Sequence, residues 1–227
     1  MSTWTPLESN PEVLTKYIHK LGVSPAWSVN DVIGLDEDTL EWIPRPVKAF
    51  ILLFPCSESY EKHRAEEHER IKEVKDDYPA DLFYMRQFTS NACGTVALIH
   101  SVANNKEVEI DNGVLKAFLE KTASLSPEER GQALETDKDF TADHQALAQE
   151  GQTNAAEHET VIHHFIALVN KEGTLYELDG RKSFPIKHGP TSEETFVKDA
   201  AKVCKEFMAR DPNEVRFTVL ALTPAQD

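Results

Sequence analysis

Apolar residues recur along this chain at two spacings, one typical of helices and the other of strands. Residues 11–21 carry an apolar stripe at helical spacing, preceded by Asn10 as a predicted cap. Residues 47–54, which are apolar except for Lys48, predict a buried strand, and residues 192–210 carry another helical stripe, with Ser192 as its predicted cap. The same patterns predict further helices at 36–42, 57–76, 93–103, 113–119, 140–149 and from 127 onward, and further strands at 4–7, 161–169, 174–179 and 216–222. This mixture, with no internal repeat or long linker, predicts a single α/β domain.

Three segments lack a strong apolar pattern. Residues 57–76 are rich in Glu, Lys and Arg with few apolar positions, which predicts a surface helix whose charges are solvated. Residues 150–159 carry Gly, Gln, Thr and Asn, which predicts an exposed, mobile loop. Residues 180–190 combine Gly, Pro and basic residues and are expected to form another loop.

The strand at 161–169 is expected to form a hairpin with the strand at 174–179. Apolar positions alternate along the first strand, so His164 lies on one face and His163 on the other. If Asn170 pairs with Gly173 across the turn, His164 stands opposite Asp179, and Cβ atoms of opposed residues lie about 4.5 to 5.5 Å apart. That register would let a carboxylate hold the imidazole.

Length and charge narrow the class of protein. With 227 residues and 40% hydrophobic content the chain can build a substantial core. The formal net charge of −15 argues against nucleic acid and anionic membranes as partners, since both require a basic surface. A basic partner would be attracted, although acidic surface charge by itself identifies no ligand.

Cysteine usage and the pattern of the first residues predict the compartment. The three cysteines, Cys56, Cys93 and Cys204, are odd in number and have no CxxC spacing, so a disulfide framework is not expected. The first residues lack a basic region followed by an apolar stretch, and the longest apolar run, 49–54, is too short to span a bilayer. We therefore expect a cytoplasmic monomer without a membrane anchor.

Cys93 is the candidate nucleophile, because a polar loop runs into a helix that begins at this residue. Ser90 or Asn91 can cap the helix, and free backbone N–H groups in the first turn favour the thiolate and can hold an oxyanion. Gln87, six residues earlier, is a candidate second oxyanion donor. The alternative is a small buried hydrophobic residue, the role that we expect for Cys56 and Cys204.

His164 and Asp179 complete the arrangement of nucleophile, base and orienting acid that thiol hydrolases require. From its position alone His164 could equally be a hydrogen-bonded core histidine. A metal site formed with His158 and His163 is disfavoured, since neighbouring residues of a strand face opposite ways. A serine nucleophile has no GxSxG motif to support it.

Three motifs carry a resemblance to a known family: Gln-Phe-Thr-Ser-Asn-Ala-Cys-Gly-Thr at 87–95, His-Phe-Ile-Ala-Leu-Val at 164–169 and Leu-Tyr-Glu-Leu-Asp-Gly-Arg at 175–181. With them, nearly the whole chain resembles the short ubiquitin carboxyl-terminal hydrolases, which are papain-like cysteine peptidases. The resemblance implies an α+β fold with a central antiparallel sheet flanked by helices, a knotted backbone, and a crossover loop over the active site near residues 137–159.

The resemblance also implies roles for individual residues. Cys93 is similar to the family's nucleophile, His164 to its general base, Asp179 to the orienting acid and Gln87 to the oxyanion donor. No metal or cofactor is implied. The implied ubiquitin contacts are Pro6, Leu7, Glu8, Glu12, Asp31, Gln152, Thr153 and Leu220. Asp31 would suit an arginine of the ubiquitin tail.

The expected function is thiol-dependent hydrolysis of amide, ester or thioester adducts at the C-terminal glycine of ubiquitin. Two alternatives remain open. The chain could act on another ubiquitin-like modifier, or it could bind ubiquitin without catalysis. The presence of all four residue types, Gln, Cys, His and Asp, argues against the second alternative.

Overall fold

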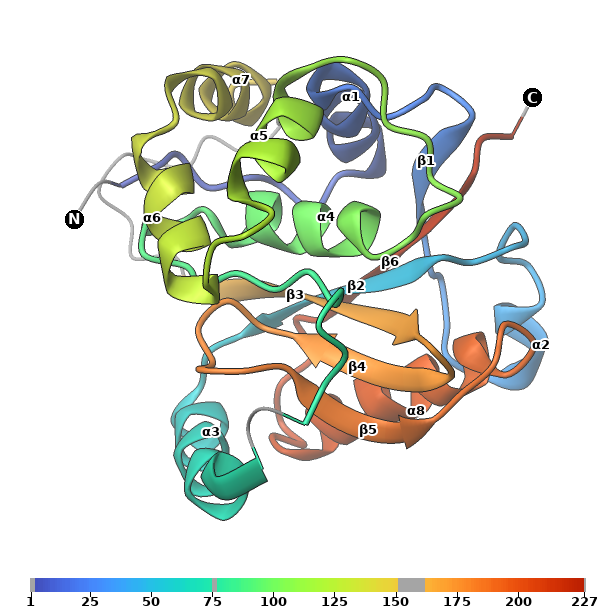
Figure 1. The fold of residues 1–227 in the computed structure, drawn as a ribbon. Helices are drawn as coiled ribbons and strands as arrows, with labels where there is room; N and C mark the ends of the chain where they lie inside the picture. The colour runs from blue at the N-terminus through green and yellow to red at the C-terminus, as the bar shows by residue number, and fades with distance from the viewer. Residues whose placement is uncertain (1–2, 75–76, 151–161, 227) are drawn as a thin grey trace.

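One six-stranded sheet runs through the molecule (Figure 1). The computed structural model describes residues 3–74, 77–150 and 162–226. Each pair of neighbouring strands in the sheet is antiparallel. Across the sheet the order is β1 (Trp27–Asp31), β6 (Thr218–Pro224), β2 (Ala49–Pro55), β3 (His163–Lys171), β4 (Thr174–Leu178) and β5 (Ile186–Pro190). The expected antiparallel sheet is therefore confirmed.

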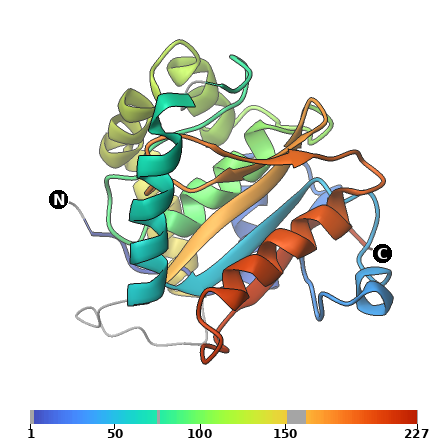
Figure 2. The same ribbon diagram turned by 90° about the horizontal axis from the view of Figure 1, so that it is seen from below.

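Helices cover both faces of this sheet. On the upper side in Figure 1 lie α1 (Pro11–Leu21), α4 (Cys93–Ala103), α5 (Val114–Thr122), α6 (Pro127–Thr136) and α7 (Lys138–Ala148). On the other side, which faces the viewer in Figure 2, lie α8 (Phe196–Ala209) and α3 (Glu58–Ile71), the latter continued by a 3-10 turn at Lys72–Val74. The short α2 (Glu37–Leu40) lies near α8. None of the helices in the described ranges has the length and apolar character needed to cross a membrane.

The sheet separates two hydrophobic cores, and β3 contributes to both. Phe165 and Ala167 pack in the core beneath α4, whereas Ile166 and Leu168 pack in the core beneath α8. This division confirms the predicted alternation along β3. Helix α4 is buried at every position from Cys93 to Val102, which explains why its sequence is apolar nearly all round.

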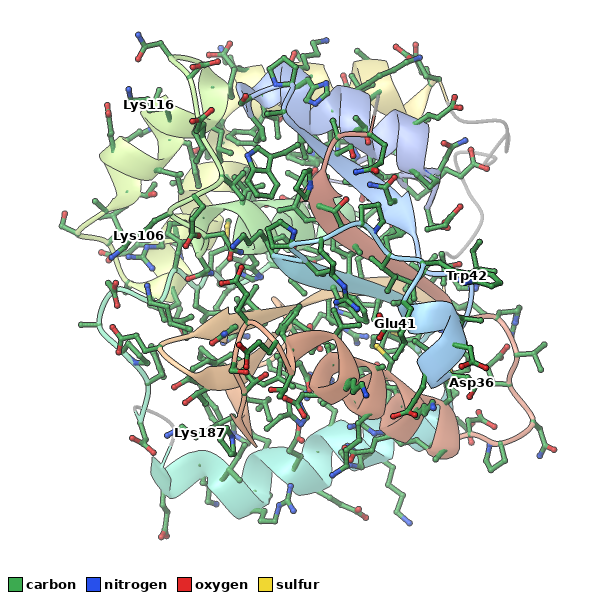
Figure 3. All side chains as sticks on the ribbon, turned by 90° about the vertical axis from the view of Figure 1, so that its right-hand side faces the viewer. Asp36, Glu41, Trp42, Lys106, Lys116 and Lys187 are labelled. Carbon is green, nitrogen blue, oxygen red and sulfur yellow. The ribbon has the colours of Figure 1, made fainter. Side chains whose placement is uncertain are left out.

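Local signals set several helix ends as expected. The Asn10 side chain accepts hydrogen bonds from the first turn of α1, and Gly22 ends that helix with a left-handed φ of 108°. Ser126 and Glu129 form a capping box at the start of α6. On the outside, charged side chains such as Asp36 and Lys106 surround the molecule, and Trp42 is exposed after α2 (Figure 3).

Other predicted elements were wrong in kind or extent. Residues 4–7 form no strand. The neighbouring Thr3 makes an isolated bridge with Ser90. Strand β5 occupies part of the predicted loop at 180–190. Helix α8 begins four residues after Ser192, because the Ser192 side chain accepts from the N–H of Thr195 and closes a separate turn.

The register of the β3–β4 hairpin also differs from the prediction. Lys171 pairs with Thr174, so the turn consists of Glu172 and Gly173, whose φ values of 50° and 78° are left-handed. His164 therefore does not stand opposite Asp179 in the ladder. Asp179 follows the last residue of β4, and only its side chain reaches back to His164.

Gly131 of α6 is in close contact with the segment that leads to Gln87. A Cβ atom at this position would come within 2.0 Å of the Arg86 carbonyl oxygen, which is backbone and cannot move alone. We expect Gly131→Ala to lower the free energy of unfolding by about 1 to 3 kcal/mol, as overpacking commonly does, despite alanine's higher helix propensity. Urea unfolding of this variant and of Gln132→Ala, an exposed position on the same helix, would test it. Equal midpoints in the two variants would contradict the prediction.

Candidate active site

The fold brings three distant residues into one buried site. Cys93 is the first residue of α4, His164 is the second residue of β3, and Asp179 directly follows β4. The exposed fractions are 9%, 3% and 0%, respectively. Because the site lies where a helix begins and strands end, its side chains meet although as many as 86 residues separate them, the difference between positions 93 and 179.

The start of α4 is organised differently from the prediction. Ala92 is the N-terminal cap residue and no side chain caps the helix, so neither Ser90 nor Asn91 has the expected capping role. Asn91 instead adopts a left-handed φ of 63°, and its side-chain amide donates to the Trp4 carbonyl at 2.9 Å. The N–H groups of the first turn are therefore not occupied by a capping side chain. This arrangement leaves them available to a thiolate or an oxyanion.

The N-terminal segment packs against this helix start. A Cβ atom at Gly94 would lie 3.0 Å from Cδ1 of Leu7, so the two residues are already in close contact. Leu7 is itself 7% exposed. Trp4 donates its backbone N–H to the Ser90 carbonyl at 3.0 Å, which ties the same segment to the loop before Cys93. Trp4 and Leu7 thus lie against the residues on either side of Cys93 in sequence.

His164 is oriented by Asp179. Its Nε2 lies 2.6 Å from Asp179 Oδ1, which leaves Nδ1 as the ring nitrogen for the Cys93 thiol. Phe54 packs edge-on against the imidazole, with ring centroids 5.8 Å apart. Burial lowers the pKa of His164, but the Asp179 carboxylate and the neighbouring Cys93 outweigh it and raise the pKa to about 9.

The Asp179 carboxylate is held at both oxygens. Oδ1 accepts from His164 and from the backbone N–H of Arg181 at 2.8 Å, while Oδ2 accepts from the Tyr60 hydroxyl at 2.7 Å. Burial raises the pKa of this carboxyl, but His164, Lys182 and Tyr60 together hold the pKa well below its usual range. The carboxylate therefore remains charged at neutral pH although it is buried.

Gln87 is fixed beside the same turn. Its backbone N–H donates to the Gly180 carbonyl at 2.8 Å, and its side-chain Nε2 donates to the Thr89 carbonyl at 3.0 Å. An amide nitrogen carries two hydrogens, so one remains for an oxyanion. A Cβ atom at Gly180 would lie 3.0 Å from Cβ of Gln87, which explains the glycine in the Asp-Gly-Arg motif. The role of Gln87 as an oxyanion donor stays a prediction.

Burial raises the pKa of the Cys93 thiol, but His164 and the N–H groups of Phe165 and Gly94 outweigh burial and bring this pKa below its ordinary value. Thiolate and imidazolium should therefore coexist from below the ordinary thiol pKa up to about pH 9, where His164 loses its proton. We expect alkylation of Cys93 by iodoacetamide, followed by mass spectrometry, to become fast below pH 8. A single rise centred near pH 8.5, the value of a free thiol, would contradict this ion pair.

The other two cysteines lack such surroundings. Cys204 is fully buried in α8, and burial raises its pKa to about 12. Burial likewise raises the pKa of Cys56 to about 11, even though Arg181 Nη1 lies 2.9 Å from its sulfur. Both thiols are therefore protonated at neutral pH, which agrees with the packing role predicted for them.

Three of the predicted contact residues surround a single cavity. Glu8, Glu12 and Asp31 line a hollow of about 500 Å³ between the start of α1 and the end of β1. Glu8 directly follows Leu7, the residue packed on Gly94, so this acidic hollow adjoins the helix start that carries Cys93. Pro6 is half-buried beside Leu7.

The remaining predicted contacts do not join this surface. Leu220 is fully buried in β6, where its side chain packs in the core, so it offers no surface to a partner. Gln152 and Thr153 lie outside the described residues, as does much of the predicted crossover loop. Residues 138–148 of that expected loop form α7, whose His144 hydrogen-bonds Thr95 of α4 at 2.8 Å.

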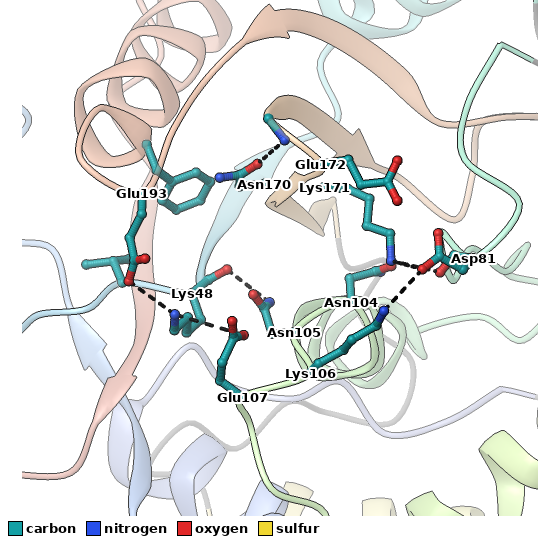
Figure 4. A pocket seen from close by; sticks show the side chains of 13 residues that line it. Lys48, Asp81, Asn104, Asn105, Lys106, Glu107, Asn170, Lys171, Glu172 and Glu193 are labelled. Atoms are coloured by element: carbon teal, nitrogen blue, oxygen red, sulfur yellow. Dashed lines mark hydrogen bonds and ion pairs between the residues drawn. The ribbon is translucent and has the colours of Figure 1, made fainter.

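A second polar cavity, of about 280 Å³, lies at the turn end of β3, away from His164 (Figure 4). Lys171 pairs there with Asp81 at 2.7 Å, and Lys48 with Glu193 at 3.3 Å. Because its lysines have carboxylate partners, this cavity has no excess positive charge with which to attract an anion. The Cys93 site is the stronger candidate for chemistry.

Helix α3 contributes to the site in a way that the sequence did not reveal. Its charges were expected to be solvated, yet Glu67 is 6% exposed and pairs with Lys182, while Glu61 pairs with Arg181 at 2.6 Å. Tyr60 reaches Asp179 directly. The only signal for Tyr60 was an isolated aromatic residue within a charged helix.

Comparison with known proteins agrees with this geometry. Residues 4–209 match the model of the family described as ubiquitin carboxyl-terminal hydrolase, family 1. A Drosophila melanogaster ubiquitin carboxyl-terminal hydrolase is 90% identical over 226 residues, covering 100% of both chains. Human ubiquitin carboxyl-terminal hydrolase isozyme L1 is 44% identical over 222 residues, covering 97% of this chain and 98% of its own.

A solved structure shares the fold. The Trichinella spiralis UCH37 catalytic domain bound to ubiquitin vinyl methyl ester superimposes with a TM-score of 0.78 at 28% identity, covering 99% of this chain and 97% of that one. The match extends over the sheet and both helical layers, since it covers nearly the whole chain. The fold, the buried Cys93 site and these relatives lead to one conclusion: the chain belongs to the ubiquitin carboxyl-terminal hydrolase family 1.

Proposed function

We propose that this protein hydrolyses amide, ester and thioester bonds at the C-terminal glycine of ubiquitin, with Cys93 as the nucleophile. The observation that carries the proposal is the buried arrangement of Cys93, His164 and Asp179 at the start of α4, in a chain of this family. Its relatives are named for this reaction, and the UCH37 domain was solved with a ubiquitin ester.

The reaction follows from the protonation states. The Cys93 thiolate attacks the glycine carbonyl carbon and forms a sulfur–carbon bond, while the carbonyl oxygen becomes an oxyanion. The Cys93 N–H and the free amide hydrogen of Gln87 stabilise that oxyanion. His164 gives its Nδ1 proton to the leaving group, whose bond to the carbonyl carbon breaks, and a thioester remains.

Water completes the cycle. Neutral His164 removes a proton from a water molecule, which attacks the thioester carbonyl and releases ubiquitin with a free carboxylate. The sulfur leaves as thiolate beside the re-formed imidazolium, so the starting ion pair is restored. Asp179 stabilises the imidazolium at both stages and keeps Nδ1 facing the reacting atoms.

The acidic hollow supports a basic substrate tail. Glu8, Glu12 and Asp31 line one hollow at the surface, and we propose that their carboxylates pair with an arginine of the tail. Differential affinity across this acidic surface would decide between ubiquitin and another ubiquitin-like modifier, since the proposed chemistry at Cys93 is the same for both.

Asp31→Asn should weaken substrate binding without changing the chemical step. We expect KM to rise by about 2- to 5-fold with kcat within twofold, because an exposed ion pair contributes up to about 1 kcal/mol. Steady-state hydrolysis of a fluorogenic ubiquitin C-terminal amide would measure both constants. The matched control is Asp38→Asn, which removes the same charge from the exposed surface of α2. Equal KM values for the two variants would remove Asp31 from the proposed contacts.

The proposal is tested by reaction with ubiquitin carrying a C-terminal vinyl methyl ester, followed by mass spectrometry of the digested adduct. We expect one adduct, on Cys93, with Cys56 and Cys204 unmodified. Binding of ubiquitin without an adduct would favour a non-catalytic binding protein. Faster reaction with the matching probe of another ubiquitin-like modifier would transfer the same chemistry to that substrate.

A further inference from the structure

We propose that Tyr60 is a positioning residue for this reaction, whose hydroxyl holds the Asp179 carboxylate in the orientation that His164 requires. The inference rests on the proposed function, because it concerns the same ion pair. Tyr60 lies in the first turn of α3, on the opposite face of the sheet from the helix that carries Cys93. It touches neither the sulfur nor the imidazole by hydrogen bond, so it acts through Asp179.

The hydrogen bonds of Asp179 show why one hydroxyl matters. Oδ1 has two partners, His164 Nε2 at 2.6 Å and the Arg181 N–H at 2.8 Å. For Oδ2, the hydroxyl of Tyr60 at 2.7 Å is the only hydrogen-bond donor found among the described residues. A carboxylate fixed at both oxygens cannot rotate about its Cβ–Cγ bond. Without the hydroxyl, the buried Oδ2 would lose this donor. The carboxylate would then rotate toward other donors, and its hydrogen bond to His164 would weaken.

Tyr60 is rigid enough for this task. Its side chain is buried, with 3% exposed, and its ring packs on Phe54 with centroids 4.7 Å apart. The same Phe54 ring meets His164 edge-on at 5.8 Å. Phe54 therefore contacts the rings of both residues that hydrogen-bond Asp179 through their side chains. Packing of this kind reduces the entropy lost when the hydrogen bond forms.

Helix α3 secures the rest of the turn that carries Asp179. Arg181 pairs with Glu61 at 2.6 Å, and its carbonyl accepts from Arg64 at 3.3 Å. One turn further, Lys182 pairs with buried Glu67 at 2.5 Å. These contacts fix the backbone, and Tyr60 is the residue of α3 that hydrogen-bonds the carboxylate itself. The turn and its carboxylate are thus held by the same helix through separate contacts.

Tyr84 provides a matched control. Its hydroxyl is also fully buried and also contacts residue 179, but its one hydrogen is shared between the backbone carbonyls of Asp179 and Lys182, whose oxygens lie 2.7 and 2.6 Å away. Tyr84→Phe removes a tyrosine hydroxyl that contacts the same turn, but it leaves the hydrogen-bond partners of the Asp179 carboxylate unchanged. Any effect that Tyr60→Phe shows beyond Tyr84→Phe therefore reports on the carboxylate itself.

The experiment compares the full-length wild type, Tyr60→Phe and Tyr84→Phe in two assays over pH 5 to 10. One assay is hydrolysis of a fluorogenic ubiquitin C-terminal amide, and the other is alkylation of Cys93 by iodoacetamide, located by mass spectrometry. Thermal unfolding verifies that each variant is folded at the assay temperature. Alkylation reports on the ion pair even if the wild type fails to cleave ubiquitin, so the two proposals can fail separately.

We expect Tyr60→Phe to lower kcat about tenfold with KM within twofold, as loss of a hydrogen bond to a charged group implies. The pH at which Cys93 alkylation begins to rise should move to higher pH, because a rotated carboxylate stabilises the imidazolium less and the imidazolium is what lowers the pKa of the Cys93 thiol. Tyr84→Phe should leave that onset in place. An unchanged onset in Tyr60→Phe would overturn the proposal. A shift of the onset to lower pH would also overturn it, because the hydroxyl would then only withdraw charge from a carboxylate that keeps its orientation.

Discussion

Cys93→Ala should abolish hydrolysis of ubiquitin adducts, with kcat at least about 10⁴-fold below that of the wild type. The variant has no sulfur to form the thioester, and removal of a nucleophile commonly costs a hydrolase this much or more. Ubiquitin binding should remain within about threefold, since the acidic hollow of Glu8, Glu12 and Asp31 is untouched. Single-turnover assays at high enzyme concentration measure the first quantity, and isothermal titration calorimetry the second.

Cys204→Ala is the control for this variant. It removes a thiol that is buried in α8, on the other face of the sheet, and should retain wild-type kcat. Turnover by Cys93→Ala close to that of Cys204→Ala would exclude Cys93 as the nucleophile. If Cys93→Ala loses both ubiquitin binding and turnover, Cys93 contributes to the structure of the binding surface. Its role as the nucleophile would then be decided by the reaction of the wild type with ubiquitin vinyl methyl ester.

The start of the catalytic helix could be found from the sequence because its causes are local. A polar loop, a cysteine and the apolar run at 96–99 predict a buried helix, and α4 begins at Cys93 as expected. The capping of this helix was predicted wrongly, because the cap residue is Ala92, whose side chain cannot accept a hydrogen bond, and neither polar candidate occupies that position. Asn91 has a partner 87 residues away in Trp4, and that contact depends on the folded N-terminal segment.

The partnership of His164 and Asp179 was predicted with an incorrect geometry. The sequence Asn-Lys-Glu-Gly at 170–173 permits two turns, and the one that forms places Glu172 at a left-handed φ, where glutamate is uncommon. His164 and Asp179 are the residue types that the reaction requires, whichever register the hairpin adopts. The Asp179 side chain reaches His164 although the two residues are not paired in the ladder, so the required residue types predicted this contact better than the strand pairing did.

Two features were missed for different reasons. Strand β5 contains Gly189 and Pro190 and pairs only with β4 at the edge of the sheet, where proline is tolerated. The charges of α3 seemed typical of a solvated helix because their partners, Arg181 and Lys182, are more than 100 residues away. Only the folded chain shows that this helix supports Asp179.

Asp179→Asn should lower kcat by about 10³- to 10⁴-fold, the largest effect expected from any residue that does not bond to the substrate. The change is nearly isosteric, but the amide cannot stabilise an imidazolium, and its NH₂ group competes with His164 and Tyr60 as a donor. The pKa of His164, now raised to about 9, should fall, because Asp179 is the stronger of the two groups that oppose the effect of burial and only Cys93 would remain. The ion pair with Cys93 would be weakened at neutral pH.

Two measurements would establish this role of Asp179, namely kcat over pH 5 to 10 and the NMR titration of the His164 imidazole. We expect both a low plateau of kcat and a His164 that titrates at lower pH than in the wild type. Asp38→Asn, which removes one carboxylate from the exposed surface, should behave as the wild type in both. If the variant keeps the raised pKa of His164 but loses kcat, groups other than Asp179 stabilise the charged imidazolium. Asp179 would then act by holding the ring in place, and its hydrogen bond to Nε2 would matter more than its charge.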